Sequence, residues 1–218
     1  MSKRKAIKNQ PKAKPVVSRA KPEIVEKEFN PVWVNGDYEA PGNDGNWKKI
    51  FYAVSGVLLL LTMILALRSG VNSDERYQTP YSDKVLGYYT TFGKDTSWLD
   101  RQSIGKIHYY GAFYEVIAGA TNKALGYKDT QTAYFKVRHF YIALFGWLGM
   151  LIAGLIIFEL AGWRAGTIAM ALLFLSPRYL GHSLMNPKDI PFAMAYLLGV
   201  WFLIRLVRNL PEIRWKDV

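Results

Sequence analysis

Two short stretches of the sequence gather side chains that could do chemistry. The first is an acidic pair, Asp74 and Glu75, shortly after a long apolar stretch. The second precedes another apolar stretch and holds Arg178, His182, Lys188 and Asp189. Carboxylates can deprotonate a hydroxyl group or hold a divalent cation, and Arg and Lys can hold a phosphate leaving group and stabilise its charge. If both stretches line one cavity open to lipid, they suit a substrate with a phosphate head and an isoprenoid tail.

Composition excludes several other chemistries. The chain has 218 residues, no Cys and three His, and no two His are three or four residues apart. Disulfides, thiolate zinc sites and a Cys nucleophile are therefore excluded, and a His-based zinc helix is not supported. Neither a G-x-x-x-x-G-K-[ST] nor a G-x-G-x-x-G motif occurs, so a P-loop NTPase or a dinucleotide-binding fold has no support.

The net charge of +11 is concentrated at the N-terminus. Residues 1–21 hold eight of the 28 Lys and Arg residues and no acid, so the remaining 197 residues are nearly neutral. We predict that residues 1–47 form a disordered basic tail in the cytoplasm, held near anionic lipid. Nucleic-acid binding is less favoured, because the tail lacks the interleaved aromatic residues of a strand-binding surface.

Apolar stretches in the rest of the chain predict an all-α integral membrane protein. We expect a membrane domain over 48–218 with about four transmembrane helices, over residues 50–67, 140–158, 166–184 and 190–207. The first stretch has 18 residues without a charge, which nearly crosses a hydrocarbon core of about 30 Å. It is too long, and lies too far from the N-terminus, for the apolar part of a cleaved signal peptide.

The distribution of basic residues predicts a multi-pass topology in the inner (plasma) membrane with both termini in the cytoplasm. Residues 68–139 then form a large outer loop. Within it, residues 104–125 carry apolar side chains mainly three or four apart, which indicates an amphipathic helix on the membrane or against the bundle. His108 and Tyr109 lie near its start and either support a site or belong to an interfacial aromatic belt.

In these residues the chain resembles the lipid-carrier-dependent glycosyltransferases of the GT-C fold, the superfamily of protein O-mannosyltransferases and aminoarabinose transferases. The shared features are an acidic pair directly after the first span, an outer loop with His108-Tyr109-Tyr110-Gly111, and a distinctive run from Pro177 to Phe192. That run reads P-R-Y-x-G-H-S-x-x-N-P-K-D-I-P-F. The resemblance covers about residues 48–210 and excludes the basic tail.

The resemblance implies roles for individual residues. Asp74 would be the general base that activates an acceptor hydroxyl, with Glu75 as its neighbour, and Asp189 would be a second, supporting acid. The residues expected near the donor phosphate are Arg178, His182 and Lys188. A sugar would pass from a polyprenyl-phosphate donor to the acceptor on the outer face, with inversion. The two carboxylates permit Mg²⁺ or Mn²⁺ without requiring it, and no other cofactor or nucleic acid is expected.

Enzymes of the GT-C superfamily have many more spans than this chain. We therefore expect it to be the N-terminal portion of one, or a short relative with a partner subunit, and to be inactive alone.

Two other functions stay open at this point. The alternative is a non-catalytic membrane subunit or scaffold whose outer loop binds a partner. A transporter ranks third, because the sequence shows no internal repeat and no charged or broken helix near the middle of the first two spans.

Overall fold

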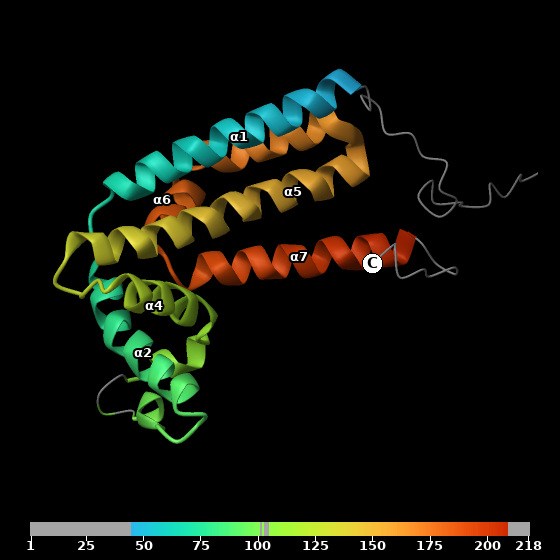
Figure 1. Cartoon of the computed structure of the whole chain (residues 1–218). Helices are drawn as coiled ribbons and strands as arrows, with labels where there is room; N and C mark the ends of the chain where they lie inside the picture. The colour runs from blue at the N-terminus through green and yellow to red at the C-terminus, as the bar shows by residue number, and fades with distance from the viewer. Residues whose placement is uncertain (1–44, 101, 103–104, 209–218) are drawn as a thin grey trace, which may run out of the picture. The chain divides into compact units, whose positions relative to one another are not determined.

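The computed structural model describes residues 45–100, 102 and 105–208. All of these residues belong to one compact unit. All regular elements among the described residues are helices, which confirms the predicted all-α fold class (Figure 1). The predicted tail, 1–47, lies outside the described residues except for its last three positions.

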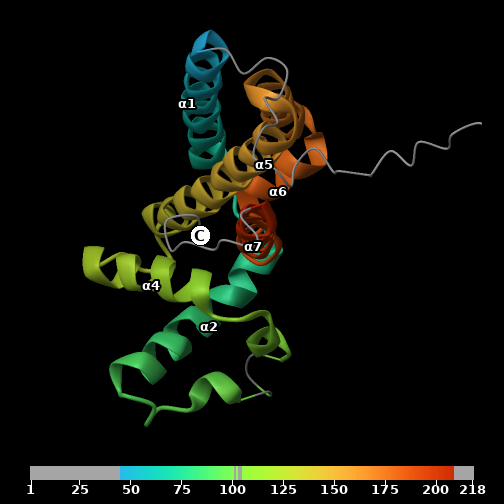
Figure 2. The ribbon, with the colours of Figure 1, turned by 90° about the vertical axis from the view of Figure 1, so that its right-hand side faces the viewer.

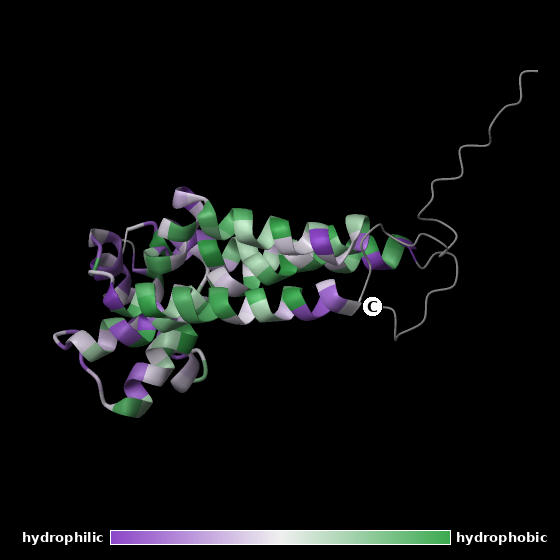
Figure 3. Cartoon of the chain, turned by 90° about the horizontal axis from the view of Figure 1, so that it is seen from above, coloured by the Kyte–Doolittle hydropathy of each residue, from purple (hydrophilic) through white to green (hydrophobic). Residues whose placement is uncertain are grey.

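Within the described part, three helices are long and apolar enough to cross a membrane: α1 (Gly45–Arg68), α5 (Thr132–Leu175) and α7 (Asp189–Arg208). Apolar residues predominate along these helices, and polar residues gather mainly at the helix ends and on the shorter helices (Figure 3). Side chains such as Leu60 and Leu172 are 64% and 62% exposed. Soluble proteins rarely expose such extended apolar surface, whereas lipid contact favours it. The chain is an all-α membrane protein.

Helix α5 folds back at Gly162, where φ is +84°. Figure 1 shows the chain reversing direction there, so that residues 132–161 and 163–175 run as two antiparallel limbs. Glycine reaches positive φ without the steric cost that a Cβ atom would add. The sequence predicted helices over 140–158 and 166–184 with a turn between them. The observed first limb begins eight residues earlier, and helical structure reaches Gly162 from both sides.

The predicted helix over 166–184 is in fact two helices. The second limb of α5 ends at Leu175, and α6 (Pro177–Met185) begins after Ser176. Pro177 lacks a backbone N–H and clashes with the preceding turn, so it ends one helix, but its fixed φ suits the first turn of the next. The Ser176 side chain caps α6 by accepting a backbone N–H.

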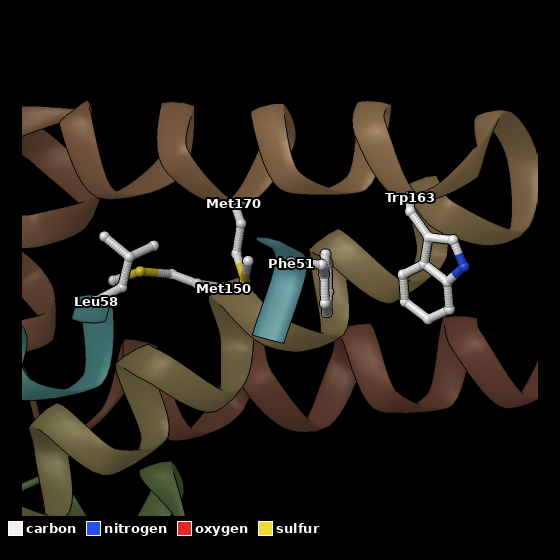
Figure 4. Close-up of a cluster of buried hydrophobic side chains, with 5 residues drawn as sticks. All are labelled: Phe51, Leu58, Met150, Trp163 and Met170. Carbon is white, nitrogen blue, oxygen red and sulfur yellow. The ribbon is translucent and has the colours of Figure 1, made fainter. Parts of the chain in front are cut away.

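A buried apolar cluster joins α1 to both limbs of α5. Figure 4 shows its five fully or nearly buried members: Phe51, Leu58, Met150, Trp163 and Met170. The buried positions of α1 recur every three or four residues, as expected for a helix with one face against a neighbour. That face also carries Ser55, whose carbonyl oxygen accepts the indole N–H of Trp147 (2.9 Å). Apolar packing and this hydrogen bond together hold α1 on α5.

Glycines allow the two limbs of α5 to approach each other closely. A Cβ atom at Gly166 would lie 2.5 Å from the carbonyl oxygen of Gly154, and a backbone atom cannot move aside as a flexible side chain can. We therefore expect Gly166→Ala to lower the free energy of unfolding by about 1–3 kcal/mol, measured as a lower thermal unfolding temperature in detergent. Gly181→Ala, in α6, is the matched control, because a Cβ atom there meets nothing within 4 Å. Equal stability of the two variants would contradict close packing of the limbs.

Shorter helices follow α1 and form the segment that was predicted as an outer loop: α2 (Ser73–Thr90), η1 (Ser97–Leu99), η2 (Ile107–Tyr110) and α4 (Phe113–Leu125). Helices α2 and α4 lie against each other in Figures 1 and 2 and are in direct contact. The amphipathic helix predicted over 104–125 is interrupted at Gly111, where φ is +79°. Its second part, α4, packs on α5, since the buried Tyr114 donates a hydrogen bond to the carbonyl oxygen of Arg138 (3.0 Å).

Candidate functional site

The acidic pair stands in the first turn of α2, and its two members face different surroundings. Asn72 caps this helix: its side chain accepts the backbone N–H of Glu75 (2.9 Å), and its own N–H donates to the Glu75 carboxylate (3.1 Å). This reciprocal arrangement satisfies two of the N–H groups that a helix start leaves unpaired. Glu75 is fully buried, whereas the Asp74 side chain is 61% exposed. Asp74 alone of the pair is accessible.

The cationic segment meets the start of α2. The Asn72 side chain donates to the carbonyl oxygen of Met185, at the end of α6 (2.9 Å). The Lys188 ammonium lies 3.4 Å from the Asp74 carboxylate. These contacts join positions more than 110 residues apart in the chain. They bring the acidic stretch and the cationic stretch together.

One cavity, here called the α6 cavity, lies between the start of α2 and helix α6. Its volume is about 410 Å³, and its lining includes Asp74, Arg178 and His182. Within the described part of the chain Arg178 has no ion-pair partner, so its charge is available to a ligand. His182 is oriented by the Asn186 side chain, whose nitrogen lies 2.8 Å from its Nδ1 atom. A cation, an imidazole and a carboxylate thus share one open hollow.

A second cavity, here called the α2 cavity, also has Asp74 in its lining. It measures about 280 Å³ and is lined by Asp74, Tyr77, Gln78, Lys106, Ile107, Tyr110 and Lys188. The Lys188 ammonium lies 4.8 Å from the centre of the Tyr110 ring, within the range of a cation–π contact. Asp74 therefore lines both hollows, and each of them carries at least one cationic side chain.

Glu75, predicted as a neighbour of the base, lines neither cavity. Its carboxylate is directed at His139 of α5, whose Nε2 lies 3.1 Å away. The other ring nitrogen of His139 lies 3.2 Å from the carbonyl oxygen of Ala66 and 3.2 Å from the Ser69 hydroxyl. This buried junction joins the end of α1, the start of α2 and the first limb of α5. Glu75 positions α2.

The predicted supporting residues also lie outside the two cavities. His108 and Tyr109, in η2, contact each other with their rings tilted and the ring centres 4.1 Å apart, and it is the next residue, Tyr110, that reaches the α2 cavity. Asp189 begins α7 and accepts a hydrogen bond from the Asn186 side chain (2.8 Å). Among the described residues, no three His, Asp or Glu side chains are grouped to hold a metal ion.

Sequence reasoning missed a buried ion pair behind the site. Arg138 of α5 donates two hydrogen bonds to the Glu115 carboxylate of α4 (2.9 and 3.0 Å), and both side chains are buried. Burial raises the pKa of the Glu115 carboxyl, and the nearby guanidinium opposes that rise. The available signal was an Arg-His pair just before an apolar stretch, since charges at such borders usually face a partner.

The arrangement places one exposed carboxylate between two hollows that carry cations. A carboxylate in this position can accept a proton from a hydroxyl group, and the cations can hold a phosphate. No protein-family model, curated protein or solved structure matches the chain significantly. Function is therefore inferred from this geometry and from the residue pattern.

Proposed function

We propose that the chain is a membrane glycosyltransferase of the GT-C type, or the N-terminal part of one, that moves a sugar from a polyprenyl-phosphate donor to an acceptor hydroxyl. The observation that carries the proposal is the contact between Asp74 and Lys188 at the boundary of the two cavities. It brings together the two segments on which the resemblance depends. The extended apolar surface of the helices beside the site suits a substrate with a lipid tail.

Each residue then has a definite task. Asp74 takes the proton from the acceptor hydroxyl, and the acceptor oxygen attacks the anomeric carbon of the sugar. The bond between that carbon and the phosphate oxygen breaks, its electron pair stays on the phosphate, and the configuration inverts. Arg178 and His182, in the α6 cavity, bind the departing phosphate, and Lys188 neutralises part of its charge. Phosphate is already a good leaving group, so no acid is needed to protonate it.

The helix ends support an orientation for the site. Glu75, His139 and Ala66 meet at one end of the long helices, beside Asp74. Arg208, at the end of α7, is paired with Glu159 near the fold-back of α5, at the other end. If the helices cross the inner membrane with both termini in the cytoplasm, the site lies on the outer face. The two limbs of α5, with α6 continuing the second, then supply the middle crossings.

This orientation can be tested by labelling, because the chain has no Cys and each introduced thiol is unique. We expect Ala120→Cys, exposed on α4, to react with a membrane-impermeant maleimide in intact cells. Gly45→Cys, exposed at the start of α1, should react only after the membrane is permeabilised. The reverse pattern would put the site in the cytoplasm and end the proposed topology.

The activity is tested in membranes of the cells from which the chain comes, where any further region or partner subunit is present. A panel of radiolabelled polyprenyl-phosphate sugars is supplied, and transfer to endogenous acceptors is compared between the wild type and a strain that carries Asp74→Asn. We expect one donor to give a product of inverted anomeric configuration that the variant does not form. Transfer that is equal in both strains, or missing for every donor, would favour a non-catalytic subunit.

A further inference from the structure

A third cavity, here called the aromatic cavity, adjoins the α2 cavity. It has a volume of about 250 Å³ and is bounded by residues of α2, η2, α4 and the start of α7. Its apolar walls include Tyr110, Phe113 and Phe192. Gln78, Tyr110 and Lys188 line both cavities, so the aromatic cavity opens beside the contact between Asp74 and Lys188.

Two residues that line this cavity carry buried polar groups with no hydrogen-bond partner in the described part of the chain. The side chain of Gln78 belongs to a residue only 2% exposed, and neither its oxygen nor its nitrogen is hydrogen-bonded within the described residues. The hydroxyl of Tyr81, three residues later on α2, is likewise unpaired there, and its residue is 1% exposed. A buried polar group left unpaired is costly, so such groups are rare in folded proteins. Because both residues line the same cavity, one ligand bound there can supply partners for both groups.

The lining selects the chemistry of that ligand. An amide offers both donors and an acceptor, and burial raises the pKa of the Tyr81 hydroxyl, which keeps it protonated. The two charged side chains that line the cavity are already paired, Glu115 with Arg138 and Lys188 with Asp74, so the lining does not call for a charged ligand. The volume is below the usual range for drug-sized ligands, which limits the occupant to about one ring. Aromatic walls suit the C–H faces of a ring that presents hydroxyl groups at its edge.

We propose that the aromatic cavity is a subsite for a neutral sugar ring, with the Gln78 amide and the Tyr81 hydroxyl bound to its hydroxyl groups. The proposal rests on the proposed function, since it names the group that lies next to Asp74 during transfer. The ring belongs either to the donor, whose phosphate occupies the α6 cavity, or to a sugar acceptor. Both sources present the same chemistry, and binding measurements separate them.

Calorimetric titration of the full-length protein in nanodiscs tests the subsite directly. The probes are farnesyl phosphate, farnesyl phosphate linked to mannose, glucose or galactose, and the free methyl glycosides of the same sugars. We expect Gln78→Leu to weaken binding of a sugar-bearing probe roughly 10-fold and to leave binding of bare farnesyl phosphate unchanged. Arg76→Leu is the matched control, because Arg76 is exposed on the same helix and lines none of the three cavities.

The outcomes distinguish the two sources and both proposals. A loss confined to the linked sugars assigns the ring to the donor, and a loss confined to methyl glycosides assigns it to the acceptor. Unchanged binding of every sugar by Gln78→Leu, or no sugar binding by the wild type, overturns the subsite and means that water alone fills the cavity. Asp74-dependent transfer would still stand in that case. Sugar binding that depends on Gln78, without any sugar transfer, would support the subsite and contradict the proposed enzyme activity.

A second variant protects the test against misfolding. Tyr81→Phe removes one hydroxyl group and leaves the ring in place. We therefore expect this variant to fold even if Gln78→Leu does not. We expect it to weaken binding of the same sugar probe about 5-fold. Wild-type affinity in Tyr81→Phe, with Gln78→Leu unfolded, would also overturn the subsite.

Discussion

We expect Asp74→Asn to lower the rate of the proposed sugar transfer by about 10²- to 10⁴-fold, the usual range for loss of a general base. The amide has nearly the shape of the carboxylate but cannot accept the acceptor's proton. The side chain is exposed, and it forms an ion pair with the partly exposed Lys188, so folding does not depend on its charge. Initial rates with saturating donor, in membranes that contain equal amounts of each protein, measure the effect.

Asp83→Asn is the control for this prediction. Asp83 lies on the same helix, is exposed, and lines none of the three cavities. The same chemical change there should leave the transfer rate within about twofold, since surface changes of this kind have little effect. If Asp74→Asn retained the wild-type rate, the role of Asp74 as base would be wrong, whatever the other residues do.

Arg138→Met lowers the free energy of unfolding by about 3–5 kcal/mol, because it leaves the buried Glu115 carboxylate without its countercharge. The pair joins α4 to α5, and the guanidinium is fully buried. Loss of the pair therefore also loosens α4 on the long helices. Thermal or denaturant unfolding of the full chain in detergent measures the change.

The double variant Arg138→Met with Glu115→Gln identifies the cause. In the double variant position 115 carries a neutral amide, so no buried charge is left without a partner. An apolar residue beside such an amide is often tolerated, and we therefore expect most of the lost stability to return. Lys136→Met, exposed on the same helix, is the matched control and should change stability by less than about 0.5 kcal/mol. A single variant as stable as that control would show that the ion pair contributes little.

Much of the site was predictable because local signals marked its two segments. Apolar stretches long enough to cross a membrane bracket Asp74 and Lys188, and the order of these stretches brings both to the same end of the helices. Predicting that Asp74 and Lys188 lie at the same end required only the lengths of the helices and the number of times that the chain reverses direction between the two residues. Membrane helices are well suited to this reasoning, since their backbone groups must all be paired within the helix.

The role of Glu75 could also have been read from the sequence. Asn followed three residues later by Glu is the signature of a capping box, and the run Asn72-Ser73-Asp74-Glu75 has this form. Because both acids were interpreted as groups for catalysis or metal binding, this capping pattern was overlooked. One carboxylate of the pair completes the start of the helix, and the other is left for a ligand.

Other features depended on contacts that spacing does not encode. His139 is bound to Glu75 across 64 positions, and Arg138 to Glu115 across 23, so neither partner can be found from periodicity. The fold-back at Gly162 and the break at Gly111 are both set by positive φ. A sequence shows that glycine permits such a turn, but packing decides which glycine uses it.

The double role of Asn72 has a consequence for turnover. Its hydrogen bonds to Glu75 and Met185 fasten the two halves of the site without using Asp74 or Lys188. The solvent-accessible ion pair between those two is worth roughly 1 kcal/mol or less. In the proposed reaction, an incoming phosphate can therefore bind Lys188 at small energetic cost while Asn72 keeps the two segments together. Once the product has left and Asp74 has released its proton to water, the ion pair with Lys188 can form again before the next cycle.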